Sequence, residues 1–341
     1  MKLIQKIPAP EEVCDRFPIT DEERLQRKAV LEELRKILSG RSEKKILLIG
    51  PCSADREDAV LEYVFRLSEL AEEVKEVLLV IPRVYTSKPR TNGGGYKGML
   101  HRPVASGLED DLVSGVIAVR KLHQHVVRET GLFAADELLY PSLYPYMADL
   151  LVYVAVGARS VEDQEHRLVA SGMDVPVGMK NPTSGDTSVM LNAVMAAQHK
   201  HRIIFNGWEA ETEGNPFTHC ILRGYTNIAG ESVPNYYYEN LIHLHDAYYR
   251  QNLMNPAAII DCNHANSNKQ YDEQVRIVED VLVSCKRSKA VNSLVKGMMV
   301  ESYLEDGAQM PGEGVFGKSI TDPCIGWDKT EELIKSLCEN L

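Results

Sequence analysis

A cationic, glycine-rich loop follows one apolar segment of this sequence. Val77–Ile81 is apolar and rich in β-branched residues, and Pro82 ends the run. The loop carries four basic residues and three consecutive glycines: Arg83, Lys88, Arg90, Lys97 and Gly93–Gly95. Arginine forks match phosphate and carboxylate groups, and glycines let backbone N–H groups approach an anion closely. The pattern favours an anion site after a buried strand, although a solvated basic loop after an edge strand would share this composition.

Further basic residues follow other apolar runs. Arg159, Lys180 and Arg223 each come within three residues of the end of such a run. Any one of them could be an exposed surface charge. Together with the cationic loop they need several anionic groups as compensation, because uncompensated charge is costly in a partly closed site. The sequence therefore predicts ligands that carry two or three phosphate or carboxylate groups.

A second set of residues could bind a metal ion: Cys52, His264, Glu301 and Asp322. Each follows an apolar run or lies in a glycine-flanked loop. A thiolate, an imidazole and two carboxylates suit Mn²⁺, Fe²⁺, Co²⁺ or Zn²⁺ better than Ca²⁺ or Mg²⁺. No local spacing rule such as CxxC supports the site, and Cys52 or His264 could instead be an ordinary buried residue.

The apolar runs alternate with amphipathic segments. We predict strands over 46–49, 77–81, 132–135, 150–156, 175–179, 220–222, 257–260 and 295–300. Helical patterns separate most of them, for example over 55–75, 110–128 and 186–197. Eight such units, each ending in a charged or metal-capable residue, favour a (β/α)8 TIM barrel, whose strand ends converge on one face. An open doubly wound sheet would bring together only two or three of those ends.

Two segments fall outside the eightfold pattern. Residues 1–45 are predicted to form an N-terminal extension that makes oligomer contacts, with a helix over 22–38 capped by Thr20 and Asp21. The segment 202–217 contains a further apolar run and an acidic, glycine-containing turn. We interpret it as a β-hairpin inserted before the sixth barrel strand. The catalytic barrel is expected over 46–341.

Composition limits the class of protein. No apolar run in the 341 residues approaches the roughly 20 that a membrane helix needs, so no membrane partner is expected. Seven scattered cysteines, in a chain whose first residues do not resemble a signal peptide, indicate reduced thiols in the cytoplasm. The formal net charge of −11 disfavours a nucleic-acid partner. Anionic ligands must then be attracted by local positive charge.

With these residues assembled, the chain resembles the type I 3-deoxy-D-arabino-heptulosonate 7-phosphate (DAHP) synthases. The motifs that carry the resemblance run in order through nearly the whole chain: IGPCS at 49–53, RVY at 83–85, KPRT at 88–91, GAR at 157–159, PVGMKN at 176–181, LRG at 222–224, HANS at 264–267, MVES at 299–302 and GKSITD at 317–322. Several are long enough to be specific.

The resemblance implies a metal-dependent condensation of phosphoenolpyruvate with D-erythrose 4-phosphate, which yields DAHP and phosphate in the first step of the shikimate pathway to aromatic amino acids. It places one divalent metal, with Mn²⁺ the first expectation, on Cys52, His264, Glu301 and Asp322. It places phosphoenolpyruvate on Arg83, Lys88, Ala158, Arg159, Lys180 and Arg223. It places erythrose 4-phosphate on Lys88, Pro89, Arg90, Thr91 and Asp322. The predicted catalytic residues are Lys88 as acid for the new alkoxide, Glu137 as the group that orients water, and His264.

The sequence departs from the family pattern in three places. The loop over 92–97 is one residue longer and richer in glycine, which leaves the role of Lys97 open. The N-terminus is shorter than in feedback-inhibited members, and 202–217 and 233–238 differ in detail. An aromatic amino acid effector is therefore an open expectation, as is the choice between a homodimer and a homotetramer.

Three other classes of protein fit part of this pattern. Another phosphoenolpyruvate-aldose condensing barrel, such as a 3-deoxy-octulosonate 8-phosphate or sialic acid synthase, would prefer a different aldose. A class II metal aldolase would release no free phosphate and is usually richer in histidine at the metal. A non-catalytic sugar-phosphate sensor would keep the pocket without turnover, and a missing metal ligand would favour it, but all four expected ligands are present.

Overall fold

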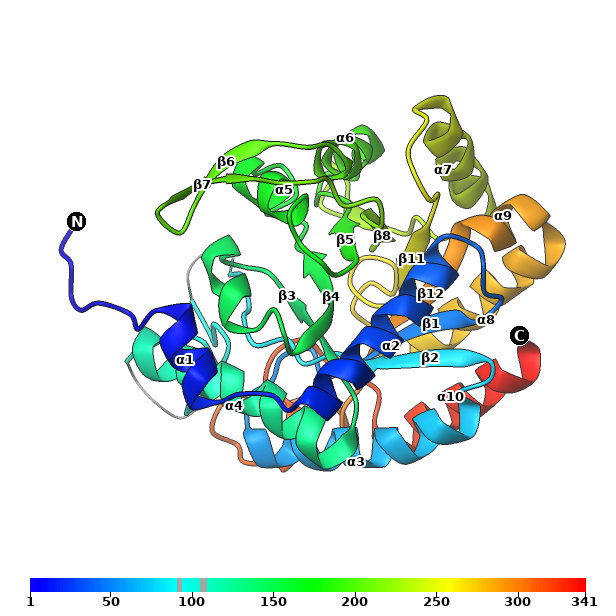
Figure 1. Cartoon of the computed structure of the whole chain (residues 1–341). Helices are drawn as coiled ribbons and strands as arrows, with labels where there is room; N and C mark the ends of the chain where they lie inside the picture. The colour runs from blue at the N-terminus through cyan, green and yellow to red at the C-terminus, as the bar shows by residue number, and fades with distance from the viewer. Residues whose placement is uncertain (91–93, 105–108) are drawn as a thin grey trace.

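A computed structural model describes residues 1–90, 94–104 and 109–341 (Figure 1). Its barrel strands are β1 (Lys45–Gly50), β2 (Leu78–Pro82), β3 (Ala134–Glu137), β4 (Leu151–Val156), β5 (Val177–Lys180), β8 (His219–Leu222), β11 (Ala258–Asp261) and β12 (Val295–Glu301). The helices include α1 (Pro10–Arg16), α2 (Asp21–Leu38), α3 (Glu57–Val74), α4 (Leu112–Thr130), the 3₁₀ helix η1 (Pro141–Tyr146), α5 (Gln164–Ala170), α6 (Thr187–Gln198), α7 (Tyr238–Arg250), α8 (Glu273–Arg287), α9 (Lys289–Leu294) and α10 (Trp327–Asn340).

The eight barrel strands are parallel and follow the order β2-β1-β12-β11-β8-β5-β4-β3. The ends of this sheet meet where Arg83, just after β2, forms a parallel bridge with Ala135 of β3. The Val84 amide also donates to Ala135 O at 3.0 Å. The predicted (β/α)8 barrel is therefore confirmed. Each predicted strand lies within two residues of the observed one, because short apolar runs mark strands that are buried on both faces.

Helices cover the outside of the barrel in chain order (Figure 1). Helix α3 packs against β2 and against its neighbours α4 and α10, and α5 packs against α6. Their apolar residues recur at helical spacing, as in α3, where Ala59, Val60, Tyr63, Val64 and Leu67 are all buried. This arrangement leaves the carboxyl ends of the strands to the loops that carry the basic and metal-capable residues.

His219 lies inside the barrel, and its imidazole is neutral. His219 Nε2 lies 2.8 Å from the Tyr153 hydroxyl, and its Nδ1 lies 2.8 Å from the Phe217 carbonyl oxygen. Because a carbonyl only accepts, Nδ1 carries the proton and Nε2 accepts from Tyr153. Burial lowers the pKa of His219 to about 4. A Cβ at the neighbouring Gly178 would meet the Tyr153 hydroxyl oxygen at 2.2 Å, so this layer has no space for a larger residue.

The N-terminal extension packs on its own barrel. Helix α2 begins with a capping box, in which Thr20 Oγ1 accepts from the Glu23 amide at 3.1 Å. Arg27 Nε donates to Leu151 O at 2.8 Å, at the first residue of β4, so α2 lies by the amino ends of the strands. Arg120 of α4 holds the preceding loop by donating to Phe17 O at 2.7 and 2.9 Å. The contribution of this extension to oligomer contacts stays a prediction.

Within the described ranges, three short strand pairs lie outside the barrel: β6 (Arg202–Phe205) with β7 (Trp208–Glu211), β9 (Tyr225–Thr226) with β10 (Ser232–Val233), and β13 (Glu305–Ala308) with β14 (Lys318–Ser319). The antiparallel β6–β7 pair is the hairpin predicted before the sixth barrel strand, which is β8. It occupies only the first part of 202–217, because the rest of that segment leads into β8. Among the described helices, none has the length and apolar character needed to cross a membrane.

Candidate active site

A polar cavity of about 470 Å³ lies at the carboxyl ends of the barrel strands. The structure brings nearly all of the predicted site residues to its wall: Arg83, Lys88, Pro89, Arg90, Glu137, Ala158, Arg159, Lys180, Arg223, His264, Glu301 and Asp322. Cys52 is fully buried behind this wall, with its Sγ 2.7 Å from Lys88 Nζ. Thr91 falls outside the described residues. The convergence follows from the fold, because the carboxyl ends of barrel strands meet on one face.

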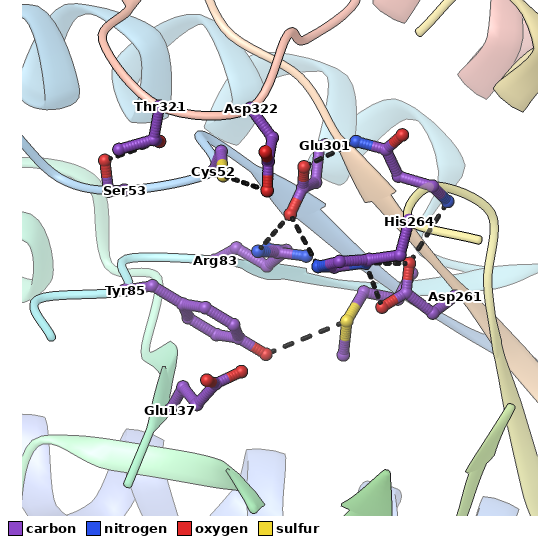
Figure 2. A network of polar contacts seen from close by, with 12 residues as sticks. Cys52, Ser53, Arg83, Tyr85, Glu137, Asp261, His264, Glu301, Thr321 and Asp322 are labelled. Atoms are coloured by element: carbon purple, nitrogen blue, oxygen red, sulfur yellow. Dashed lines mark hydrogen bonds and ion pairs between the residues drawn. The ribbon is translucent and has the colours of Figure 1, made fainter. Parts of the chain in front are cut away.

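Arg83 and Glu301 form a buried ion pair at the centre of the site (Figure 2). Arg83 Nη2 donates to Glu301 Oε1 at 3.0 Å, and Asn263 Nδ2 donates to Glu301 Oε2 at 2.5 Å. Burial would raise the pKa of Glu301, but His264 and Arg83 lower it below its ordinary value. The carboxylate is therefore ionised. Arg83 Nε and Nη1 are buried and have no hydrogen-bond partner among the described residues.

Lys88 lies between a thiol and a carboxylate. Its Nζ is 2.7 Å from Cys52 Sγ and 3.4 Å from Asp322 Oδ2, and Lys269 Nζ is 2.9 Å from Asp322 Oδ1. Burial alone would lower the pKa of Lys88, but Cys52, Asp322 and Glu301 raise it above its ordinary value. Burial raises the pKa of the Cys52 thiol to about 11, with Glu301 adding to the rise and Lys88 opposing it. Lys88 is therefore a stably protonated amine.

Glu137 and Lys180 form a second ion pair on the other side of the cavity. Their side chains are 10% and 4% exposed, and Lys180 Nζ donates to Glu137 Oε2. Burial would raise the pKa of Glu137, but Lys180 lowers it below its ordinary value. Glu137 is thus an ionised hydrogen-bond acceptor that faces the cavity. Figure 2 shows it on the opposite side of Tyr85 from the carboxylates of Asp322 and Glu301.

Unusual backbone conformations position Cys52 and His264. A Cβ at Gly50 would lie 2.5 Å from Arg83 O, so glycine permits the close approach of the Gly-Pro-Cys turn to the end of β2. His264 has φ +56°, a left-handed conformation that is uncommon for a residue other than glycine. Its Nδ1 lies 2.9 Å from Oδ2 of the fully buried Asp261. Such strain occurs where the surroundings hold a functional side chain in place.

Comparison with known proteins agrees with this geometry. The model of the DAHP synthetase I family matches residues 16–335. The chain belongs to this family. This family member is 35% identical over 350 residues to the Tyr-sensitive phospho-2-dehydro-3-deoxyheptonate aldolase of Escherichia coli (strain K12), across 99% of this chain and 94% of the relative. The relationship expected from the motifs is therefore confirmed.

Two further relatives match this DAHP synthetase I family member over at least 99% of its length. The Phe-sensitive phospho-2-dehydro-3-deoxyheptonate aldolase of Escherichia coli (strain K12) is 36% identical over 346 residues, across 99% of this chain and 95% of the relative. The solved structure of the phospho-2-dehydro-3-deoxyheptonate aldolase from Francisella tularensis SCHU S4 matches with a TM-score of 0.92 at 29% identity. That match covers 100% of this chain and 98% of the other. The chain is accordingly an enzyme of a barrel family.

The predicted donor residues suit the divalent metal that the family suggests. One ligand atom from each of Cys52, Glu301 and Asp322 lies within 4.8 Å of the other two (Figure 2). His264 is not a member of this three-residue group, but its Nε2 lies 3.8 Å from Glu301 Oε1. A sulfur, a nitrogen and carboxylate oxygens form a donor set for a borderline metal ion. Since metals bind the thiolate, loading this site would release the Cys52 proton.

Several residues of the site were not anticipated from the sequence. The cavity is also lined by Tyr85, Ser87, Thr183, Thr226 and Lys269. Ser87 and Tyr85 could have been inferred from their place in the cationic loop, whereas the threonines carry no signal of their own. Lys97 was grouped with the strand-end cations, but it does not line this cavity. It pairs instead with Asp110 at 2.6 Å.

Proposed function

We propose that this DAHP synthetase I family member condenses phosphoenolpyruvate with D-erythrose 4-phosphate, in a metal-dependent reaction that opens the shikimate pathway. The names of its relatives and the ordered motifs support this assignment. The two substrates together carry one carboxylate and two phosphates. The site residues have the roles predicted from the resemblance, with Thr91 included although it lies outside the described residues.

The excess of positive charge in the cavity is the observation that supports the proposal most directly. Among its described lining residues, seven arginines and lysines face three carboxylates. Arg83 adds two buried guanidinium nitrogens that have no partner within the described chain. An unpaired buried donor costs free energy until a ligand binds it, so the site favours anions. Lys180 and Arg223 lie on the same wall and would help to offset the repulsion between two anionic substrates.

The residues around the cavity match the steps of such a condensation. The methylene carbon of phosphoenolpyruvate forms a bond to the aldehyde carbon, and Lys88 gives its Nζ proton to the resulting alkoxide. Water then adds to the former enol carbon, one of its protons returns to Lys88 Nζ, and the C–O bond to phosphate breaks as the second proton leaves with the phosphate. Glu137, held ionised by Lys180, accepts a hydrogen bond from that water and orients it. A divalent metal on Cys52, His264, Glu301 and Asp322 would supply Lewis-acid polarisation of the aldehyde oxygen.

The decisive experiment follows phosphoenolpyruvate consumption by ultraviolet absorbance, with erythrose 4-phosphate, with arabinose 5-phosphate or with neither sugar phosphate. Each assay is repeated after EDTA treatment and after Mn²⁺ is added back. Consumption that requires both the sugar phosphate and the metal supports the proposal. Consumption that continues after EDTA treatment would contradict the metal dependence of the proposed reaction. Consumption with arabinose 5-phosphate only would move the assignment to a related phosphoenolpyruvate-aldose synthase.

An aromatic amino acid is the effector we propose. Relatives are named Tyr-, Trp- and Phe-sensitive. A largely apolar cavity of about 380 Å³ lies between the N-terminal segment, α4 and η1, with Pro8, Leu143 and Tyr146 among its lining residues. Inhibition assays with each of the three amino acids would test this. No inhibition by any of them would contradict it.

We further propose a homodimer or homotetramer in the cytoplasm. Ile204 and Trp208 on the β6–β7 hairpin are 85% and 75% exposed, and Leu3 near the N-terminus is 90% exposed. Large exposed apolar side chains are found at many interaction surfaces. Seven free cysteines agree with a reducing compartment. Light scattering coupled to size exclusion would give the mass, and a monomer would contradict the proposal.

A further inference from the structure

Asp136 is a buried carboxylate in which all acceptor positions are used. The residue is 3% exposed. Its Oδ1 accepts from the Thr86 amide at 2.9 Å and from the Glu137 amide at 2.7 Å. Its Oδ2 accepts from the Thr86 hydroxyl and lies 3.3 Å from His123 Nε2. Four donors on one buried carboxylate make a fully satisfied polar network, which rigidifies the groups it joins.

These hydrogen bonds join the two parts of the chain that carry the proposed acid and the water-orienting group. Thr86 is fully buried and lies two residues before Lys88, after the end of β2. Glu137 is the last residue of β3 and directly follows Asp136. From the other side, the Leu100 amide donates to Thr86 O at 3.1 Å. The Asp136 carboxylate therefore ties the start of the cationic loop to the carboxyl end of β3.

We infer that Asp136 is a positioning residue, which sets the distance between Lys88 and Glu137 across the cavity. This inference rests on the proposed function, since it gives these two side chains their roles. Asp136 does not line the cavity itself, so it acts through Thr86 and Glu137. A carboxylate fits this position because one oxygen can accept from two backbone amides on adjacent elements. A shift of the loop by about 1 Å would misplace the acid, and such shifts cost roughly 100-fold in rate.

The network also predicts which substitution preserves the tie. In Asp136→Asn, the amide oxygen can replace Oδ1 and keep both backbone hydrogen bonds. Its NH₂ would then face the Thr86 hydroxyl, which can accept, and His123 Nε2. His123 Nδ1 is buried without a partner in the described structure. The imidazole proton can therefore move from Nε2 to Nδ1, which leaves Nε2 able to accept. Asp136→Ala removes every one of these hydrogen bonds.

The test compares wild type, Asp136→Ala, Asp136→Asn and a matched control, Asp149→Ala. Asp149 pairs with the buried Arg120 at 2.7 Å, away from the cavity, so its loss removes a carboxylate that holds a buried side chain without touching the site. Steady-state assays with phosphoenolpyruvate and erythrose 4-phosphate give kcat and KM. Hydrogen exchange measures the amides of Thr86 and Glu137, independently of activity. Thermal unfolding shows whether the two alanine variants are equally destabilised.

We expect Asp136→Ala to lower kcat at least tenfold, with Asp136→Asn within threefold and Asp149→Ala within twofold of wild type. The Thr86 and Glu137 amides should exchange at least tenfold faster in Asp136→Ala only. A kcat for Asp136→Ala that matches Asp149→Ala, or unchanged exchange at both amides, would overturn the inference. If Asp136→Ala does not fold, Thr86→Val replaces it: a threefold loss of kcat supports the tie, and a wild-type kcat contradicts it. An inactive wild type would refute the proposed function, while the exchange rates would still decide the inference.

Discussion

Arg83 and Glu301, 218 residues apart in the sequence, form an ion pair in which neither side chain is more than 1% exposed. Arg83 follows β2 and Glu301 ends β12, with β1 between these strands in the sheet. Removing one partner of an ion pair this deep destabilises a protein, because the remaining charge is buried without compensation. In the proposed function, Arg83 also binds an anionic substrate and Glu301 also binds a metal.

Arg83→Met should therefore damage both stability and activity. We expect the free energy of unfolding to fall by about 3 kcal/mol or more, because Glu301 keeps a buried charge without its partner. The kcat/KM for phosphoenolpyruvate should fall roughly 100-fold or more, as expected when a buried charged contact is truncated. Urea unfolding and steady-state assays measure the two effects. Arg250→Met, on the exposed surface of α7, is the control and should change neither. Wild-type stability in Arg83→Met would contradict the importance of the pair.

Cys52→Ala should impair metal binding without preventing folding. Removal of the sulfur leaves His264, Glu301 and Asp322 to hold the ion, and the affinity for Mn²⁺ should fall at least about 100-fold, since loss of an outer hydrogen bond alone costs up to that much. Metal content per chain after dialysis, measured by elemental analysis, reports this directly. Cys220→Ala removes an equally buried thiol in β8 and should keep its metal. Equal metal content in the two variants would exclude the thiol as a ligand.

His219 should make stability depend on pH. Its folded-state pKa of about 4 lies below the ordinary value of 6.5, so the unfolded chain binds more protons between these values. Stability from this residue is fully present above pH 6.5 and is lost as pH falls toward 4, by about 3 kcal/mol in total. His219→Gln should lack this part of the acid dependence. The check is urea unfolding of both proteins at pH 7.5 and pH 4.5. Parallel losses in both would contradict the prediction.

Ser87→Ala should separate substrate binding from stability. Ser87 is 1% exposed, lines the cavity, and its Oγ has no hydrogen-bond partner in the described part of the chain. Loss of an unpaired buried hydroxyl should leave the melting temperature unchanged or raise it. If the hydroxyl binds substrate, kcat/KM should fall about tenfold, which corresponds to one hydrogen bond. Ser284→Ala on α8 should leave the kinetics unchanged. Unchanged kinetics in Ser87→Ala would exclude the contact.

The sequence by itself determined the barrel and the face on which its site lies. Short apolar runs separated by amphipathic helices predict parallel strands, and polar residues after those runs must meet because parallel strand ends share one face. Arg83, Lys180, Glu301 and His264 were located in this way. Their proximity is a consequence of the repeating unit, so local patterns were sufficient.

Only the tertiary structure decided which of these residues contact one another. Lys88 and Lys97 lie in the same cationic loop, yet Lys88 turns inward to Cys52 and Lys97 pairs with Asp110 outside the cavity. No sequence pattern indicated that Asp136 accepts a hydrogen bond from the Thr86 amide, 50 residues away. A local sequence pattern shows which residues belong to a loop. The path of that loop depends on the close packing and hydrogen bonding of distant segments. That packing exists only in the folded chain.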